Sequence, residues 1–312
     1  MKAVQINAYG GDEVLEVNEN ALKPSVSPDQ ILVEVHAASI NPFDSFMRAG
    51  GLKEKIPLSL PVTLGGDFAG VVVEVGEGVS EFKAGDEVYG NALILAGGSG
   101  SFAQFAAANE ATVALKPKNI DFFQAASLPL VGVSAVQVLE DHIKLKKGQK
   151  ILIHGGAGGI GSISVQLAKA LGAYVATTVS ANDMDFARNL GADEVIDYAN
   201  EVFEDKIKDF DAVFSTVGGE VVDKSFVVLK GGGVIVSMLG QPNEGLAKKH
   251  GVVAIGQGTK TNAEDLSRLA KYVEEGKIKP QVDKVFPIEQ VQEAFEHLEK
   301  GSHRGKDVLK IY

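Results

Sequence analysis

Residues 150–173 read KILIHGGAGGIGSISVQLAKALGA, a short apolar run that breaks into glycines and then continues with helical spacing. The run at residues 151–153 is typical of a buried parallel strand. Apolar side chains then recur at steps of three and four residues from Ile160 to Leu171, which places them on one face of a helix. A second apolar run, residues 174–179, begins where the next strand of a strand–helix–strand unit belongs.

The turn between the first strand and the helix carries three glycines in G-x-G-x-x-G register, Gly156, Gly158 and Gly161. Such glycines allow a tight turn, a close approach of the backbone to a pyrophosphate and close packing of helix on strand. Free backbone N–H groups and the helix dipole would stabilise an anion there. The pattern alone fits an ordinary glycine-rich turn about equally well, and the flanking strands and helix favour a dinucleotide site.

Length and composition limit the class of protein. A chain of 312 residues is long enough for two domains, each with its own core. The net charge of −11 argues against nucleic acid or an anionic membrane as the main partner. The absence of cysteine excludes disulfides, thiolate zinc sites and a cysteine nucleophile. No long apolar window or signal-like N-terminus is present, so we expect a cytoplasmic protein.

Two kinds of pattern divide the chain. From residue 1 to about 118, short apolar runs alternate with glycine and proline turns, which predicts a barrel-like all-β unit. From about 121, strand-like and helical runs alternate, which predicts an α/β fold with a doubly wound parallel sheet. The tail adds two helices and two strands, the last at residues 308–311. We expect one β-rich domain from residues 1–123 and 258–312, and a dinucleotide-binding domain from residues 124–257.

The end of the second strand, Thr177 to Ser180, bears on the choice of cofactor. An acid about twenty residues beyond the glycines would hold the ribose hydroxyls of NAD. No acid ends this strand, so nothing there repels the 2′-phosphate of NADP, and Ser180 could donate to it. This favours NADPH. The alternative is that Thr178 and Ser180 only cap the following turn, and Arg188 is expected on a solvated helix face.

Longer motifs extend beyond the glycine loop. One resembles the signature of the zinc-independent quinone oxidoreductase (zeta-crystallin-like) group of the medium-chain dehydrogenase/reductase superfamily, and its residues are Gly148, Gln149, Leu152, the run GAGGIG at 156–161, Gln166 and Lys169. The segments MKAVQINAYGGDEVLEV, ASINPFDSFMRAG, LGGDFAGVVVEVGEGVSEFKAGDEVYG and HRGKDVLKIY are also similar to members of that group. The resemblance implies a Rossmann domain, a GroES-like catalytic domain, and a homodimer joined through residues 252–255.

The sequence departs from zinc-dependent members of the superfamily at their metal ligands. Those relatives carry a Cys near Asn41 and a Gly-His-Glu where this chain has Gly65, Gly66 and Asp67. The resemblance therefore implies that no metal is bound. Among quinone reductases a Tyr often stands at the position of Phe46, so a proton donated by that tyrosine is not expected here.

The resemblance also implies roles for single residues. Asn41 matches an Asn that faces the nicotinamide and substrate, whose amide could bind a carbonyl; a turn residue before Pro42 is the alternative. Ser180 and Tyr198 match contacts to the adenosine phosphate, whereas Asn182 stands where many relatives have Arg or Lys. The other predicted cofactor-binding residues are Ser134, Gly156, Gly158, Gly159, Ile160, Gly161, Thr178, Val217, Leu239 and Gly240.

We therefore predict metal-free direct hydride transfer from NADPH, with Asn41 as the catalytic donor to developing negative charge. A quinone is the first acceptor class, because the signature belongs to that group. The activated C=C of an enal or enone is the alternative. A third hypothesis, from another class, is an NADPH-binding sensor or structural protein with little turnover.

Overall fold

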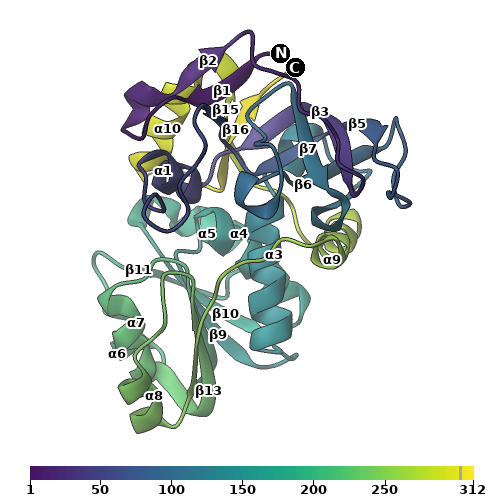
Figure 1. The fold of residues 1–312 in the computed structure, drawn as a ribbon. Helices are drawn as coiled ribbons and strands as arrows, with labels where there is room; N and C mark the ends of the chain where they lie inside the picture. Colours follow the sequence, from purple (N-terminus) through teal and green to yellow (C-terminus); the bar gives the residue numbers. More distant parts are fainter. Residues whose placement is uncertain (302–303) are drawn as a thin grey trace. The chain divides into compact units, whose positions relative to one another are not determined.

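The structure is a computed structural model that describes residues 1–301 and 304–312 (Figure 1). His303, which opens the segment HRGKDVLKIY, lies outside the described residues. The chain forms two compact units. The first unit comprises Met1–Leu130, Thr261–Glu274 and Pro280–Tyr312, and the second comprises Val131–Lys260 and Glu275–Lys279. The first unit runs past residue 123, because helix α2 (Phe122–Ala126) packs against strands β3 and β5 of that unit.

The first unit is built on a seven-stranded sheet with mainly antiparallel pairing. Its order is β15-β16-β3-β5-β6-β8, and β7 pairs with β3. These strands are β3 (Gln30–Ser39), β5 (Asp67–Val75), β6 (Glu87–Asn91), β7 (Phe105–Asn109), β8 (Val113–Leu115), β15 (Val282–Pro287) and β16 (Lys306–Lys310). A smaller sheet contains β2 (Glu16–Asn18), β1 (Ala3–Ile6) and β4 (Val62–Thr63). Helices α1 (Pro42–Arg48), α9 (Ala263–Glu274) and α10 (Val291–Glu299) complete the unit.

Aromatic side chains fill the core of the first unit. Phe68, Phe102 and Phe295 are completely buried among aliphatic residues from β1, β3, β5 and α10. The rings of Phe102 and Phe295 meet edge to face with centroids 6.2 Å apart, a geometry that aromatic pairs favour. The C-terminal residues thus form part of the same core as the N-terminal strands.

The second unit is built on a six-stranded parallel sheet in the order β11-β10-β9-β12-β13-β14. Its strands are β9 (Lys150–His154), β10 (Tyr174–Val179), β11 (Glu194–Asp197), β12 (Phe210–Ser215), β13 (Leu229–Ser237) and β14 (Val253–Gly256). The central residues of β9, Ile151 to Ile153, are fully buried, as expected for a parallel strand covered by helices on both faces (Figure 1). The predicted α/β class, with a doubly wound sheet and a β-rich partner domain, is confirmed.

The helices of the second unit connect its strands. They are α4 (Gly159–Ala170), α5 (Met184–Asn189), α6 (Phe203–Lys206), α7 (Glu220–Lys224) and α8 (Glu244–His250). Helix α3 (Pro129–Val136) precedes them and continues into a π-helical segment, η4 (Gln137–His142). Short 3-10 turns are η1 (Asp12–Val14), η2 (Ile94–Ala96), η3 (Glu110–Thr112), η5 (Ala181–Asp183), η6 (Ser225–Val228) and η7 (Ile288–Gln290). None of the described helices combines the length and apolar character needed to cross a bilayer.

Gln166 and Lys169, two residues of the quinone oxidoreductase-like signature, lie on helix α4 and bind other segments of the second unit. The Gln166 carboxamide accepts from the backbone N–H of Lys279 at 2.9 Å and donates to its carbonyl at 3.1 Å. Lys169 donates to the Ala173 carbonyl at 3.1 Å and pairs with Asp193 at 2.7 Å. These contacts give both side chains a structural role within the second unit.

Candidate functional site

Most of the predicted cofactor-binding residues follow the carboxyl ends of parallel strands in the second unit. Strands β9 to β13 run parallel, so their following loops leave the sheet at the same edge. The strand order reverses at β9, which is the usual ligand position in open α/β sheets. The glycine loop follows β9, Ser180 follows β10, Tyr198 follows β11, Val217 follows β12, and Leu239 and Gly240 follow β13.

The three motif glycines are needed for different reasons. A Cβ at Gly156 would lie 2.1 Å from Thr177 Oγ1, and a Cβ at Gly161 would lie 2.0 Å from the Gly155 carbonyl oxygen. Both positions therefore exclude any side chain within the protein itself. A Cβ at Gly158 would meet only the Gly155 oxygen at 3.6 Å, an ordinary contact. Gly158 is the N-cap of α4, followed by Gly159 and Ile160 in the first helical turn.

His154 supports the glycine loop from inside the unit. Its Nδ1 lies 2.9 Å from Thr178 Oγ1, and its Nε2 lies 2.9 Å from Ser225 Oγ. Burial lowers the pKa of His154 to about 3, so the ring is neutral at physiological pH. The Thr178 hydroxyl, which we predicted at the cofactor, is directed toward this ring and is buried.

An acid lies beside the predicted phosphate donor. Ser180 donates its hydroxyl to Asp183 Oδ2 at 2.6 Å, because the 3-10 turn η5 folds back on the end of β10. Thr177 to Ser180 carry no acid, as the sequence analysis noted, and this contact brings the carboxylate of Asp183 beside Ser180. Tyr198 is exposed at the neighbouring strand end. Arg188 pairs with Asp185 at 2.7 Å on an exposed helix face, as predicted.

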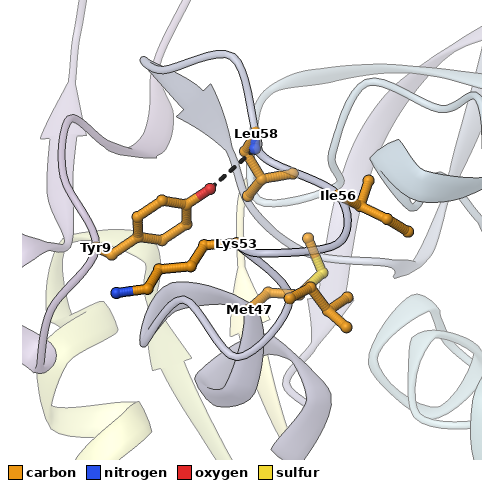
Figure 2. Close-up of a pocket in the computed structure, with 6 residues that line it drawn as sticks. Tyr9, Met47, Lys53, Ile56 and Leu58 are labelled. Atoms are coloured by element: carbon orange, nitrogen blue, oxygen red, sulfur yellow. Dashed lines mark hydrogen bonds between the residues drawn. The ribbon is translucent and has the colours of Figure 1, made fainter.

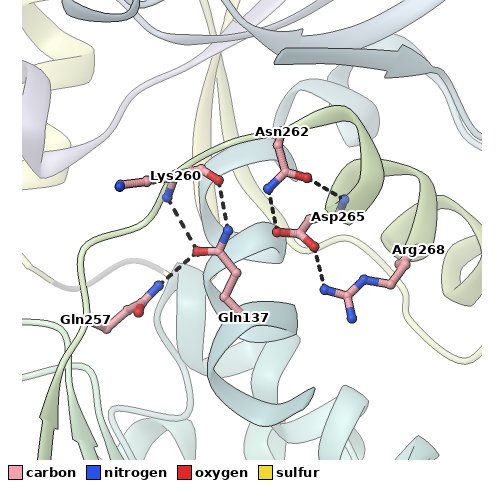
Figure 3. A network of polar contacts seen from close by, with 6 residues as sticks. All are labelled: Gln137, Gln257, Lys260, Asn262, Asp265 and Arg268. Carbon is pink, nitrogen blue, oxygen red and sulfur yellow. Dashed lines mark hydrogen bonds and ion pairs between the residues drawn. The ribbon is translucent and has the colours of Figure 1, made fainter. Parts of the chain in front are cut away.

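Ser134 lies inside the second unit. Its hydroxyl is 2.6 Å from Thr259 Oγ1, and the side chain is fully buried. One turn later, the Gln137 carboxamide accepts from Gln257 Nε2 at 2.9 Å and donates to the Lys260 carbonyl at 2.8 Å (Figure 3). These bonds tie the segment after β14 to helix α3 and its π-helical continuation.

A row of polar side chains crosses four neighbouring strands at one end of the first unit's large sheet. We call Lys306, Asn41, Asp67 and Asn91 the polar row. Val308 of β16 pairs with Ser39 of β3, and the same antiparallel register places Lys306 beside Asn41, just beyond the end of β3. Asp67 pairs directly with Asn91. Strand register therefore assembles four residues that are far apart in the sequence.

The polar row fixes the orientation of the Asn41 carboxamide. Lys306 Nζ donates to Asn41 Oδ1 at 2.5 Å and also to the Ile40 carbonyl. Asn41 Nδ2 donates to Asp67 Oδ2 at 3.0 Å, and Asn91 Nδ2 donates to Asp67 Oδ1 at 3.0 Å. An amide nitrogen carries two hydrogens. The second N–H of Asn41 has no partner in the described part of the chain and remains able to donate.

Burial perturbs the charged members of this site. Burial raises the pKa of Asp67, while the charge of Lys306 and the hydrogen bonds from Asn41 and Asn91 oppose that rise. Burial lowers the pKa of Lys306, and the neighbouring carboxylates, Asp67 foremost, counter it. Burial raises the pKa of Asp44 to about 7, although its Oδ2 accepts the Asn41 backbone N–H at 2.8 Å. Lys306 and Asp67 therefore favour each other's charged form, whereas the charge of Asp67 opposes ionisation of Asp44.

Asn41 occupies the turn position before Pro42 that the sequence analysis gave as the alternative to a catalytic role. Its backbone is extended (φ −123°, ψ 151°) and forms the N-cap of α1, with Pro42 as the first helical residue. Its carboxamide belongs to the polar row. Lys306 was missed by the sequence analysis, because the predicted closing strand began at Val308 and lysine is seldom buried. The alignment of that strand with β3 was the missing information.

The residues around α1 present apolar surface. Phe43 and Phe46 are exposed, with ring centroids 6.2 Å apart. Figure 2 shows Tyr9 beside the chain that follows α1, where its hydroxyl accepts the Leu58 N–H at 2.9 Å. Lys53 lies against the same tyrosine (Figure 2). Phe46 offers carbon atoms only, so a proton must come from another group or from water.

The zinc-ligand positions of metal-dependent relatives do not fit a metal in this chain. Asp67 accepts hydrogen bonds on both oxygens, Asn41 offers an amide, and the Lys306 ammonium would repel a cation. Among the described residues, the group that could hold a metal is Asp283, His297 and Asp307, on β15, α10 and β16. There, His297 Nδ1 already lies 3.0 Å from Asp307 Oδ2.

Comparisons with known proteins agree with this arrangement. A model of the alcohol dehydrogenase GroES-like domain matches residues 27–118, and a model described as zinc-binding dehydrogenase matches residues 190–309. The chain is 40% identical to the NADPH-dependent alkenal/one oxidoreductase, chloroplastic, of Arabidopsis thaliana, over 99% of this chain and 79% of that protein. It is 31% identical to human quinone oxidoreductase, over 100% and 98% of the two chains.

Solved structures show the same similarity over the whole chain. The quinone oxidoreductase from Coxiella burnetii superimposes with a TM-score of 0.90 at 35% identity, covering 100% of this chain and 99% of that one. The Escherichia coli quinone oxidoreductase complexed with NADPH gives 0.87 at 29% identity, covering 99% and 100%.

Proposed function

Because the chain belongs to the medium-chain dehydrogenase/reductase superfamily, in its zinc-independent quinone oxidoreductase-like group, we propose that it reduces a quinone by hydride transfer from NADPH. The observation that supports this most directly is the polar row, which orients the Asn41 carboxamide and leaves one of its N–H groups able to donate. The names of the relatives support a nicotinamide cofactor, and NADPH is our proposal within that class.

In the proposed reaction the nicotinamide supplies the hydride, and the protein supplies binding, orientation and charge stabilisation. The backbone N–H groups at the start of α4 would bind the pyrophosphate, in the space left open at Gly158. The free N–H of Asn41 would donate to the acceptor oxygen as negative charge develops on it. Lys306 and Asp67 would keep that N–H in position by holding the carboxamide from both sides.

A second acceptor class is the activated C=C of an enal or enone. The Arabidopsis relative at 40% identity is named for alkenals and alkenones, and a tomato (Solanum lycopersicum) relative at 40% identity is named 2-methylene-furan-3-one reductase. Protonation of the carbon after hydride transfer would then come from water, since Phe46 has no hydroxyl. The same Asn41 geometry serves both acceptors.

The experiment is oxidation of NADPH followed with a quinone, with an enal or enone, and with no acceptor. We expect faster turnover with the quinone, and faster turnover with the enal would reverse our order of preference. Binding of NADPH without turnover on any acceptor would favour the sensor or structural hypothesis instead. Exchanging NADPH for NADH in the same assay measures the cofactor preference.

Asn41→Ala tests the proposed catalytic donor. One such donor is worth about 3 kcal/mol of barrier, so turnover should fall on the order of a hundredfold. Asn7→Ala, which removes an exposed amide that binds Glu16, is the matched control and should keep the wild-type rate. A wild-type rate in Asn41→Ala would remove Asn41 from the proposed role.

We also propose a homodimer that forms through strand β14. This strand ends the sheet and pairs with β13 alone within the described chain, and Val253 on it is 53% exposed. An unpaired strand edge invites a second copy. Light scattering that finds only a 32.8 kDa species would rule the dimer out. A cytoplasmic location remains our prediction, and fractionation of cells that make the protein tests it.

A further inference from the structure

A histidine and two aspartates meet in the first unit, where helix α10 packs against strands β15 and β16 (Figure 1). One ligand atom from each of Asp283, His297 and Asp307 lies within 4.8 Å of the other two. Asp307 directly follows Lys306 in β16, and successive side chains of a strand point to opposite faces of the sheet. The three residues therefore form a cluster that is separate from the polar row.

An irregularity in strand pairing brings Asp283 into the cluster. Strands β15 and β16 are parallel, and their register shifts between Val282 and Lys284. Asp283 is the extra residue at this shift, so Asp283 and Lys284 both stand opposite Asp307. A β-bulge of this kind re-aims a side chain. The result is that Asp283 Oδ2 lies 3.7 Å from His297 Nε2.

The second aspartate fixes the tautomer of the histidine. His297 Nδ1 lies 3.0 Å from Asp307 Oδ2. An ionised carboxylate can only accept, so Nδ1 carries the hydrogen, and the neutral ring has a lone pair at Nε2. Asp283 Oδ2 is the neighbour of Nε2, at a distance too long for a hydrogen bond. Two acceptors therefore lie side by side. Histidines that bind metals commonly have this arrangement, with the other ring N–H donated to a carboxylate.

The carboxylate of Asp307 lacks full compensation within the described chain. Asp307 is completely buried, and its Oδ1 has no hydrogen-bond partner among the described residues. The ammonium groups of the two adjacent lysines are engaged elsewhere. Lys306 Nζ donates to Asn41 Oδ1, and Lys284 Nζ lies 4.5 Å from the centroid of the Phe286 ring. A buried oxygen of this kind is rare and calls for an ordered water or an ion.

We propose that Asp283, His297 and Asp307 form a binding site for a divalent cation of the Zn²⁺ class. His297 Nε2 and Asp283 Oδ2 would be its ligands, and Asp307 would hold the ring in place and balance the charge of the ion. Two ligands of a tetrahedral zinc ion lie about 3.4 Å apart, close to the 3.7 Å found here. The side chains of His297 and Asp283 are 29% and 24% exposed, so water can complete the coordination. The bound ion would fasten α10 to β15.

Titration calorimetry of the chelator-treated wild-type chain with ZnCl₂ at neutral pH tests the inference. We expect binding with a dissociation constant below about 100 μM. MgCl₂ should not bind at the same concentrations, because Mg²⁺ takes oxygen ligands and Zn²⁺ accepts imidazole. His297→Gln should abolish zinc binding, and Asp307→Asn should weaken it about 10- to 100-fold, as loss of the partner of a metal-bound histidine does. Zinc should also raise the midpoint of thermal unfolding of the wild type and not that of His297→Gln.

His36→Gln is the matched control. His36 Nε2 lies 3.6 Å from Glu34 Oε1, and the two side chains are 31% and 36% exposed. This pair repeats the histidine and the first carboxylate, but it belongs to no group of three possible ligands in the described part of the chain. We expect His36→Gln to bind zinc as the wild type does. If His36→Gln also abolished binding, the site would not be the proposed one, and the inference would be overturned.

Two further outcomes would also overturn the inference. Equal zinc affinity of the wild type and His297→Gln would place the ion elsewhere on the acidic surface. Absence of binding below about 1 mM would mean that a proton, and not a metal, joins His297 to Asp283. Circular dichroism checks that each variant folds. If His297→Gln does not fold, Asp283→Asn removes a ligand from the exposed side of the cluster and should show the same loss of zinc binding.

Discussion

Replacing Lys306 with methionine removes the ammonium group that balances the polar row. Lys306 is 5% exposed, and its Nζ donates to Asn41 Oδ1 and to the Ile40 carbonyl. Methionine has a similar volume, but it leaves Asp67 buried without the positive charge that holds its pKa down. Removing one member of a buried charge pair costs about 3–5 kcal/mol. We expect Lys306→Met to lose about this much folding free energy at pH 8.

A second substitution shows whether the loss comes from the unbalanced charge. Asp67→Asn keeps an acceptor oxygen and has no charge, so the double variant Lys306→Met/Asp67→Asn should recover at least about 2 kcal/mol relative to the sum of the single losses. Urea denaturation followed by circular dichroism measures each value. Lys310→Met, at the exposed end of the same strand, is the control and should change stability by less than about 0.5 kcal/mol.

Two results would refute the reasoning. A loss below about 1 kcal/mol in Lys306→Met would mean that Asp67 does not need the ammonium. Strictly additive losses in the double variant would mean that the charges of Lys306 and Asp67 do not interact. In either case the polar row would be a set of separate contacts, and the argument that it orients Asn41 would fail.

Three further predictions follow from the described contacts. The pKa of Asp44 is about 7, above its ordinary value of 3.8, so the wild-type protein loses stability as pH rises from about 4 to 7. Asp44→Asn should therefore gain stability relative to the wild type over this range, by at most about 1.4 kcal/mol per pH unit in urea titrations. Gly161→Ala should lower the free energy of unfolding by more than about 2 kcal/mol, because its Cβ would meet a backbone oxygen, and normal folding of this variant would contradict the prediction. Gly158→Ala should fold normally and bind NADPH at least about tenfold more weakly in calorimetry. Val253→Lys should convert the proposed dimer to monomer in light scattering, and an unchanged mass would exclude β14 as the interface.

The fold of the second unit could be predicted because the sequence patterns that specify it lie within short segments of the chain. Alternating strand and helix patterns, together with the glycine register, indicate a parallel sheet without knowledge of distant contacts. The predicted strand at residues 174–179 coincides with β10, and the signal was strong because both faces of the strand are buried. Sequence periodicity is most informative for elements of this kind.

The candidate site was only partly predictable, because strand register and turn geometry create it. Asn41 and Asp67 could be singled out by resemblance, but Lys306 joins them only through the antiparallel alignment of β16 with β3. Asp183 lies three residues beyond the strand end that was inspected for an acid, and the turn η5 brings it back to Ser180. Composition and periodicity carry no information about either contact.

The bond between Gln166 and Lys279 has a consequence for protein engineering. Residues Glu275–Lys279 belong to the second unit although residues on both sides of them belong to the first, and Gln166 binds this short segment at its backbone. A fragment that contains Val131–Lys260 alone would lack the segment and leave the Gln166 carboxamide without these partners. Chimaeras that exchange nucleotide-binding units between relatives should therefore transplant the five-residue segment together with the main one.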